Sequence, residues 1–206
     1  MTDFAWITTY LQHAPPNHER GDHDLNPGFH PQSPLRAAAV LVGLVNRPDG
    51  LHVLLTQRTD TLEHHPGQIC FPGGHIEADD QDATAAALRE TWEEIGLPAT
   101  NVDVMGRLDT YVTRTGFSIT PMVALIQPPF DLCLDDREVA NAFEVPLAFF
   151  MNPANHLRHQ RDFEGTRRNF YAMPYKDHYI WGATAGMLIN LYQTLQEASI
   201  DETSSN

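Results

Sequence analysis

Three glutamates, Glu90, Glu93 and Glu94, are the side chains whose type and spacing could do chemistry. In a helix, their i, i+3 and i+4 spacing would place them within an arc of about 100° on one face. Carboxylates that close repel one another and raise each other's proton affinity, and a divalent cation removes that conflict. Oxygen ligands suit hard cations, so the triplet predicts a site for Mg²⁺ or Mn²⁺. The alternative is a solvated acidic face, which is what most glutamate clusters on helices are.

The segment that must position these glutamates reads as a glycine turn followed by a helix. Phe71-Pro72-Gly73-Gly74 combines a proline that fixes φ with two glycines that open backbone paths closed to other residues. Gly96 suits the C-cap of the helix, and Pro98 prevents its continuation. Arg89, four residues before Glu93, is placed for a supporting ion pair. The apolar stripe at i, i+3, i+7 and i+10 that predicts the helix consists of Ala85, Leu88, Trp92 and Ile95.

Turn and helix together resemble the Nudix box, whose pattern is G-x5-E-x7-R-E-U-x-E-E-x-G-U with U an aliphatic residue. Arg89-Glu90, Glu93-Glu94 and Gly96-Leu97 match the pattern. Thr91 departs from it, because an aliphatic residue is usual at that position.

The segment between turn and helix is one residue longer than the pattern. Counting back from the helix, the pattern's first glutamate falls on Gln81 and its glycine on His75, so we take Gly74 as the glycine. The acids that could replace the displaced glutamate are Glu77, Asp79 and Asp80.

This resemblance implies the Nudix α/β/α sandwich, a mixed β-sheet between helices, with the site beside the N-terminal loop of the box helix. It implies metal binding by Glu90, Glu93, Glu94 and the Gly74 carbonyl. It also implies a catalytic set of Glu90, Glu138 and Arg89, in which Arg89 holds the glutamates in place. Glu138 is our candidate for a further acid because it precedes the run over residues 143–147; a solvated acidic loop is the alternative. The base is Glu90 or Glu138.

A narrower resemblance precedes the box. Leu54-Leu55-Thr56-Gln57-Arg58, Gly67 and Phe71-Pro72-Gly73-Gly74 are spaced like the signature of the coenzyme A pyrophosphatase branch of the Nudix family. That branch cleaves coenzyme A or its thioesters to 3′,5′-ADP and 4′-phosphopantetheine. The resemblance implies Arg58, His65 and Gly73 as substrate-binding residues.

Two residues depart from this signature. Thr59 replaces a serine or alanine, and Glu63 replaces the second arginine. The second change reverses a charge in a loop that helps to select the coenzyme in that branch, so another nucleoside diphosphate derivative is the alternative substrate. A Nudix-fold module that senses a nucleotide without cutting it is a third reading. The intact Arg89-Glu90 and Glu93-Glu94 pairs argue against it, because a pure binder has no chemical need for them.

Composition limits the partners. The chain has 206 residues and a formal net charge of −14, which disfavours nucleic acid and anionic membranes and leaves a small-molecule substrate. Cys70 and Cys133 predict free buried thiols rather than a disulfide framework. We expect no signal peptide, no membrane span and a cytoplasmic location.

The expected organisation is an N-terminal arm over residues 1–34, irregular or with a short helix over 1–13, a Nudix domain over 35–196 and a frayed tail over 197–206. The arm is also compatible with a homodimer. Residues 152–168 are polar and basic, and either contact phosphates or form an exposed hairpin. The predicted strands are 37–45, 51–56, 102–108, 118–126, 170–174 and 179–181; the predicted further helices are 147–151 and one that starts near 183; residues 111–117 are predicted as a loop.

Overall fold

An antiparallel hairpin at the centre of the main sheet is formed by the two apolar runs. In this computed structural model, which describes residues 4–13, 18–28, 31, 33–62, 65–163 and 165–204, β2 (Arg36–Arg47) pairs with β3 (Gly50–Arg58). Even-numbered residues of β2, such as Val42, pack into one hydrophobic cluster, and Leu41 and Val45 pack into another. Both faces of β2 are therefore buried, which is why it reads as a continuous apolar run. The predicted hairpin is confirmed.

The main sheet is mixed and has nine strands. β2 pairs parallel with β8 (Phe117–Ile126), and the order is β1-β7-β8-β2-β3-β4, with β5 on β2, β6 on β8 and β9 on β3. Strands predicted over 102–108 and 118–126 are confirmed, whereas β9 was not predicted. The remaining strands of this sheet are β1 (Glu19–Gly21), β4 (Ile69–Cys70), β5 (Gly73–His75), β6 (Val102–Arg107), β7 (Thr110–Val112) and β9 (Val139–Pro146).

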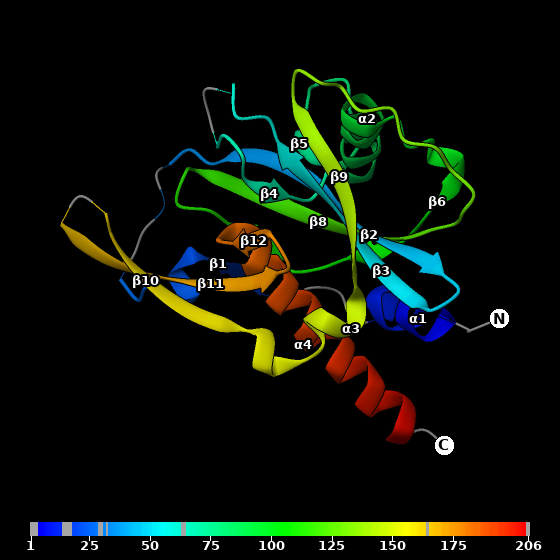
Figure 1. The fold of residues 1–206 in the computed structure, drawn as a ribbon. Helices are drawn as coiled ribbons and strands as arrows, with labels where there is room; N and C mark the ends of the chain where they lie inside the picture. The colour runs from blue at the N-terminus through cyan, green and yellow to red at the C-terminus, as the bar shows by residue number, and fades with distance from the viewer. Residues whose placement is uncertain are drawn as a thin grey trace.

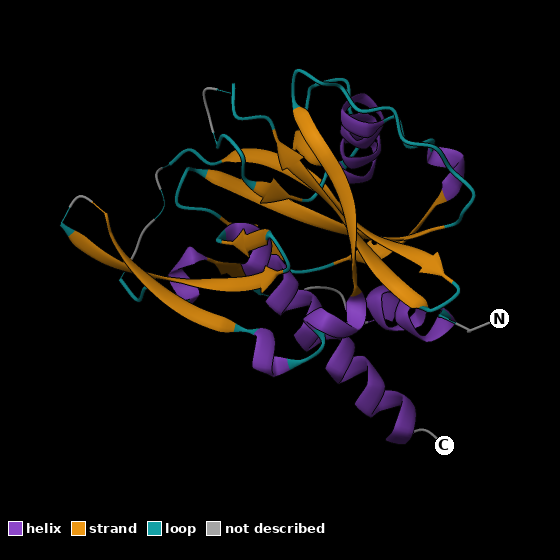
Figure 2. Cartoon of the chain, viewed as in Figure 1, coloured by secondary structure: helices purple, strands orange, loops and turns teal. Residues whose placement is uncertain are grey.

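Helices cover both faces of this sheet, so the predicted α/β/α sandwich is confirmed. α2 (Ala83–Ile95) lies on one face (Figure 1). The other face is covered by α1 (Ala5–His13), α3 (Leu147–Phe150) and α4 (Ala183–Ser204), as Figure 2 shows in purple. The predicted helices at 1–13 and 147–151 are present. Short 3₁₀ turns lie at Asp22–Asp24, Ala99–Asn101 and Pro153–Asn155.

A second antiparallel sheet consists of β10 (Leu157–Phe163), β11 (Thr166–Tyr175) and β12 (His178–Trp181). Most of the basic segment thus lies in a hairpin, one of the two alternatives, and the strands expected at 170–174 and 179–181 are confirmed. The sheet is fastened to the main body near β4, because the Thr184 hydroxyl donates to the Ile69 carbonyl at 3.0 Å. The Phe143 and His178 rings stack with 3.7 Å between their centroids.

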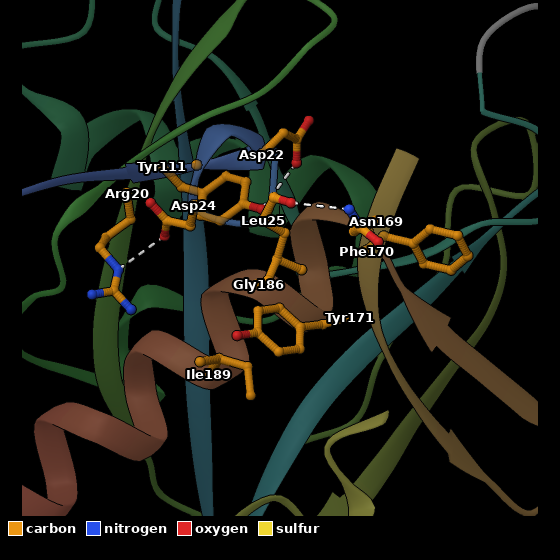
Figure 3. Close-up of a pocket in the computed structure, with 12 residues that line it drawn as sticks. Arg20, Asp22, Asp24, Leu25, Tyr111, Asn169, Phe170, Tyr171, Gly186 and Ile189 are labelled. Atoms are coloured by element: carbon orange, nitrogen blue, oxygen red, sulfur yellow. Dashed lines mark hydrogen bonds and ion pairs between the residues drawn. The ribbon is translucent and has the colours of Figure 1, made fainter. Parts of the chain in front are cut away.

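The N-terminal arm supplies a strand that the sequence did not predict. β1 pairs parallel with β7, so the loop predicted over 111–117 is wrong at its start. Tyr111 is buried, and its hydroxyl donates to an Asp22 carboxylate oxygen at 2.9 Å (Figure 3). The other Asp22 oxygen accepts the Arg114 amide at 2.7 Å. The cavity beside these residues holds about 20 Å³, room for roughly one water molecule and not for a substrate.

Two further expectations are corrected. α4 extends to Ser204, so the tail predicted to fray from residue 197 is helical to that point; Leu195 and Ala198 are buried, and Tyr10 of α1 donates to Glu197 at 2.9 Å. Cys133 is a free thiol as expected, but it is exposed. In the part of the chain that the structure describes, no helix has the length and apolar character needed to cross a membrane.

Candidate active site

Two glycines bring the turn close to both β2 and α2. Gly73 has a φ of +147°, and a Cβ there would overlap the Ala39 carbonyl oxygen. A Cβ on Gly74 would lie 2.5 to 2.6 Å from the Glu90 carboxyl atoms. Only glycine fits at position 73, because the clash there is with the backbone of β2, whereas a side chain at position 74 would displace the Glu90 carboxylate.

The buried face of α2 differs from the predicted stripe. Trp92 is 56% exposed, so its place in the apolar stripe was wrong, and the buried side chains are Ala86, Ala87, Thr91, Glu94 and Ile95. Small residues face the sheet because the helix approaches it closely at the glycine turn. Thr91, at the usual aliphatic position, is buried and donates its hydroxyl to the Ala87 carbonyl at 2.6 Å, which satisfies that polar group.

Both ends of α2 are capped. The Asp82 carboxylate accepts the Ala85 amide at 2.8 Å, an N-cap that the sequence analysis did not identify. Gly96 is left-handed, with a φ of 66°, and its amide donates to the Trp92 carbonyl at 2.8 Å. The predicted glycine C-cap is confirmed. The capped helix holds its glutamates in a fixed register against the turn.

Glu94 lies at the centre of the site and is only 4% exposed. One of its oxygens accepts the Gly73 amide at 3.2 Å, and the other lies 3.9 Å from an Arg58 nitrogen. Burial raises the pKa of Glu94 to about 8, against the lowering effects of the Gly73 amide and of Arg58. A carboxylate kept at this cost inside a fold is typical of a functional site.

The other two glutamates of the triplet differ in exposure. The Glu90 side chain is 18% exposed, and burial raises its pKa, opposed by the neighbouring Arg89. The Glu93 side chain is 56% exposed and shares Arg89 with Glu90, at 3.1 and 3.0 Å respectively. The exposure of the three glutamates therefore increases from Glu94 through Glu90 to Glu93 on one face of the helix.

Arg89 uses all five of its N–H groups on the protein. Besides Glu90 and Glu93, it donates twice to the Asp80 carboxylate, at 3.0 and 2.9 Å, and once to the His75 carbonyl at 3.0 Å. The arginine lowers the pKa of Asp80. Its contacts are those of a clamp between the turn and α2. Among Glu77, Asp79 and Asp80, it is Asp80 whose carboxylate meets this arginine. We call Asp80, Arg89, Glu90, Glu93 and Glu94 the carboxylate site.

Glu138 lies at the edge of this site. Its side chain is exposed, and its negative charge contributes to raising the pKa of both Glu90 and Glu94, so it is electrostatically coupled to them. Its backbone carbonyl accepts the Thr59 amide at 3.0 Å. The Thr59 hydroxyl donates to the Arg137 carbonyl at 3.1 Å, so this departure from the signature adds a contact that fixes the Glu138 loop.

The same loop fastens the end of α2, which the sequence analysis missed. The Asp135 amide donates to the Glu94 carbonyl, and the Cys133 amide donates to the Ile95 carbonyl, each at 2.9 Å. These are backbone contacts between segments about 40 residues apart, so no side-chain pattern signals them.

The predicted substrate-binding residues fall in different places. Arg58 and Gly73 both contact Glu94 and so lie at the carboxylate site. The Arg58 Nε is buried without a hydrogen-bond partner within the described part of the chain. His65 is exposed in a turn, has a φ of 57°, and accepts the Gln68 amide through its carbonyl. Glu63 lies outside the described residues.

The carboxylate oxygens of this site are the kind of ligand that a hard divalent cation prefers, but the side chains do not converge on one point. Over the described ranges, no group of three or more His, Cys, Asp or Glu side chains is placed to hold a metal ion. The reason is visible in the contacts: Arg89 engages Glu90 and Glu93, while Glu94 engages Gly73. Burial and mutual repulsion raise the pKa values of Glu90 and Glu94, and a cation among them would relieve both.

Comparisons with known proteins identify one family. A model of the NUDIX domain matches residues 34–169, more than half of the chain. The chain is similar to proteins named uncharacterized Nudix hydrolase NudL from Yersinia pestis (strain Pestoides F) and Yersinia pseudotuberculosis (serotype O:1b). Each is 38% identical over 158 residues, which cover 77% of this chain and 79% of the relative.

Solved structures from the same family are also similar. One is the NUDIX domain of Shewanella oneidensis NrtR complexed with ADP ribose, with a TM-score of 0.49 and 15% identity over 84% of this chain and 96% of that one. Another is a C. elegans Ap4A hydrolase, with a TM-score of 0.47 and 25% identity over 54% of this chain and 80% of that one.

Proposed function

The chain belongs to the Nudix family of hydrolases, and from that premise we propose that it cleaves the pyrophosphate bond of coenzyme A or its thioesters. The products are 3′,5′-ADP and 4′-phosphopantetheine or its acyl derivative. Membership of the family makes the chain a Nudix hydrolase, and the substrate is the part that we propose.

One observation carries the substrate assignment. The residues that resemble the coenzyme A signature meet the residues of the Nudix box in space: Arg58, which closes the Leu54–Arg58 segment, lies 3.9 Å from Glu94, and Gly73 donates to the same glutamate. Since strand β3 and helix α2 are separate elements, this convergence supports treating the signature as part of the active site rather than as strand composition alone.

We further propose that Glu90, Glu93 and Glu94, with the Gly74 carbonyl, hold a Mg²⁺ or Mn²⁺ ion. Such an ion supplies charge neutralisation at the pyrophosphate oxygens, which otherwise repel a nucleophile. Glu138 is the preferred group to take the proton of the attacking water, because it is exposed, is electrostatically coupled to the site and is not among the described partners of Arg89. Glu90 is the alternative base. Arg89 positions Glu90 and Glu93 and does not touch substrate.

Specificity for the coenzyme requires a cation near the 3′-phosphate, a group that most nucleoside diphosphate derivatives lack. Arg58 already faces Glu94, so it is better placed for the pyrophosphate. The basic hairpin of β10 and β11 is the other source of positive charge. Glu63, in place of an arginine of the signature, keeps another nucleoside diphosphate derivative as the second candidate substrate.

The test is product analysis. Purified protein is incubated with Mg²⁺ or Mn²⁺ and coenzyme A, 3′-dephospho-coenzyme A, ADP-ribose or a nucleoside triphosphate, and products are identified by mass. We expect 3′,5′-ADP from coenzyme A, and slower turnover of the dephospho compound by about tenfold, the value of one charge-assisted contact. No 3′,5′-ADP, together with rapid hydrolysis of ADP-ribose, would remove the coenzyme assignment and keep the Nudix hydrolase.

A further inference from the structure

The second sheet has one face turned to the core and one turned outward. Met173 and Ile180, which are paired across β11 and β12, are fully buried in the main hydrophobic cluster. Side chains alternate along a strand, so the neighbours of these residues point the other way. Tyr179 on this outward face is 43% exposed.

Register places aromatic rings and cations together on the outward face. His159 is paired with Phe170, and two residues further along β10 Arg161 is paired with Arg168, all on the face that carries Tyr179 and Trp181. The Phe170 and Trp181 rings meet edge to face at 5.3 Å, and the His159 ring nitrogen lies 2.7 Å from the Tyr179 hydroxyl.

An open groove of about 780 Å³, within the usual range of small-molecule sites, is lined on this face by His159, Arg161, Phe170, Tyr179 and Trp181. Arg161 supplies a cation to the groove from the outward face; Arg158 also borders it, but its guanidinium donates to the Tyr171 hydroxyl at 3.3 Å. None of the described residues that line the groove is acidic, although the whole chain has a net charge of −14. The combination of ring faces and arginines suits a ligand that is both planar and anionic. We call this surface the outer groove.

The outer groove is joined to the carboxylate site through one short strand. β12, which supplies Tyr179 and Trp181, lies beside β4, and Thr184 just after β12 donates to Ile69 of β4. β4 continues through Phe71-Pro72 into the Gly73-Gly74 turn that contacts Glu94. The strand that supplies Tyr179 and Trp181 therefore packs directly against the segment that leads into the turn.

We propose that the outer groove binds the adenine ring and the 3′-phosphate of an adenosine bisphosphate group. The ring lies against Tyr179 and Trp181, and the 3′-phosphate lies at Arg161. This inference rests on the proposed function, because it assigns to the groove the adenine ring and the 3′-phosphate of coenzyme A, on the nucleotide side of the cleaved bond. The interaction would make the enzyme bind a substrate with both a purine and a further phosphate more tightly than one that lacks either group.

The test measures binding without catalysis. 3′,5′-ADP is titrated into the full chain in EDTA, and its dissociation constant is measured by calorimetry for wild type, Tyr179→Ala, Arg161→Glu and Arg167→Glu. Arg167 is the matched control because it is exposed on the same hairpin and, by register, on the opposite face. We expect weakening by about tenfold or more in the first two variants and less than about twofold in the control.

Tryptophan fluorescence reports the location of binding. A stacked purine should quench the fluorescence of Trp181, which lies on β12. The quenching should therefore disappear in Trp181→Phe and persist in Trp92→Phe, in which the tryptophan of α2 is replaced. Absence of binding by wild type, equal weakening by Arg161→Glu and Arg167→Glu, or much tighter binding of an oligoadenylate than of 3′,5′-ADP would overturn the proposal. The last result would indicate a single-stranded nucleic acid instead.

Activity separates this proposal from the one on which it rests. Binding of 3′,5′-ADP in the groove without hydrolysis of coenzyme A would overturn the proposed substrate and keep the groove. Hydrolysis of coenzyme A with the same KM in wild type and Arg161→Glu would overturn the groove and keep the substrate.

Discussion

The carboxylate site and the outer groove are electrostatic opposites. In the first, Glu94 is almost completely buried among other carboxylates and its pKa rises to about 8, so the site suits a further cation. In the second, Arg161 lies on an open surface with aromatic rings and no acid among the described lining residues, so it suits an anion. The difference teaches that an acidic chain can still act on an anionic substrate, provided that a metal and a local basic surface divide the task.

The two regions also differ in construction. The carboxylate site depends on contacts that allow few substitutions: a Cβ on Gly73 would overlap the backbone of β2, a Cβ on Gly74 would displace the Glu90 carboxylate, and every donor of Arg89 is used by its neighbours. The outer groove depends on strand alternation, which tolerates changes at single positions. Substitutions in the first region should therefore affect turnover, and those in the second should affect binding.

The largest effect is expected from Glu94→Gln. The change removes a group that can ionise to bind a cation and keeps the shape, so turnover should fall by about 10³-fold if the group serves a metal that supplies several kcal/mol of charge stabilisation. Binding of 3′,5′-ADP in EDTA should not change. Steady-state kinetics and calorimetry measure the two. Near-normal turnover would mean that the glutamates form only an acidic helix face, and loss of nucleotide binding would mean that the two regions are not separate.

Glu138→Gln tests the exposed acid. As the base it should lower kcat by about 100-fold, at the lower end of the range for general acid–base catalysis, with KM little changed. Asp136→Asn, an exposed acid two residues away, is the matched control and should remain near wild type. A change in KM alone would make Glu138 a binding residue, and Glu90 would become the preferred base.

The stability of the metal-free protein should depend on pH because Glu94 is buried. Its folded-state pKa of about 8 lies above the ordinary 4.5, so the folded protein holds a proton that the unfolded chain loses. Stability should therefore fall as pH rises between these values, by at most about 3 kcal/mol from pH 5 to 7.5, and should level off above pH 8. Urea unfolding in EDTA measures this. Glu94→Gln should lack this component, and identical pH profiles for the two proteins would contradict it.

The smallest effect is expected from Glu63→Arg, which restores the residue of the coenzyme A signature. The prediction comes from the sequence alone, because the position lies outside the described residues. Activity on coenzyme A should be retained or KM lowered by a few-fold, since an exposed charge contributes about 1 kcal/mol or less. Kinetics at two salt concentrations check it, as the gain should shrink at high salt. A large loss of activity would show that the acid itself is required.

The sequence by itself determined the family and the core of the fold. Glycine and proline punctuation, two apolar runs and helical glutamate spacing depend on local geometry, so they predicted the β2–β3 hairpin, β6, β8, the C-cap at Gly96 and the helix that carries the glutamates. The family resemblance then supplied the layered fold and the hydrolase. These features can be predicted from sequence because each depends on one local property, such as the backbone freedom of glycine or the periodicity of apolar residues.

Tertiary structure decided what depends on contacts between distant segments. It exposed Trp92 and buried Thr91, because the orientation of α2 against the sheet and the glycine turn decides which of its faces is covered. It paired the N-terminal arm with β7, extended the last helix along α1, and joined Asp80 to Arg89. It also assembled the outer groove from three strands, since which face of a sheet is buried is set by what packs against it and not by the strands themselves.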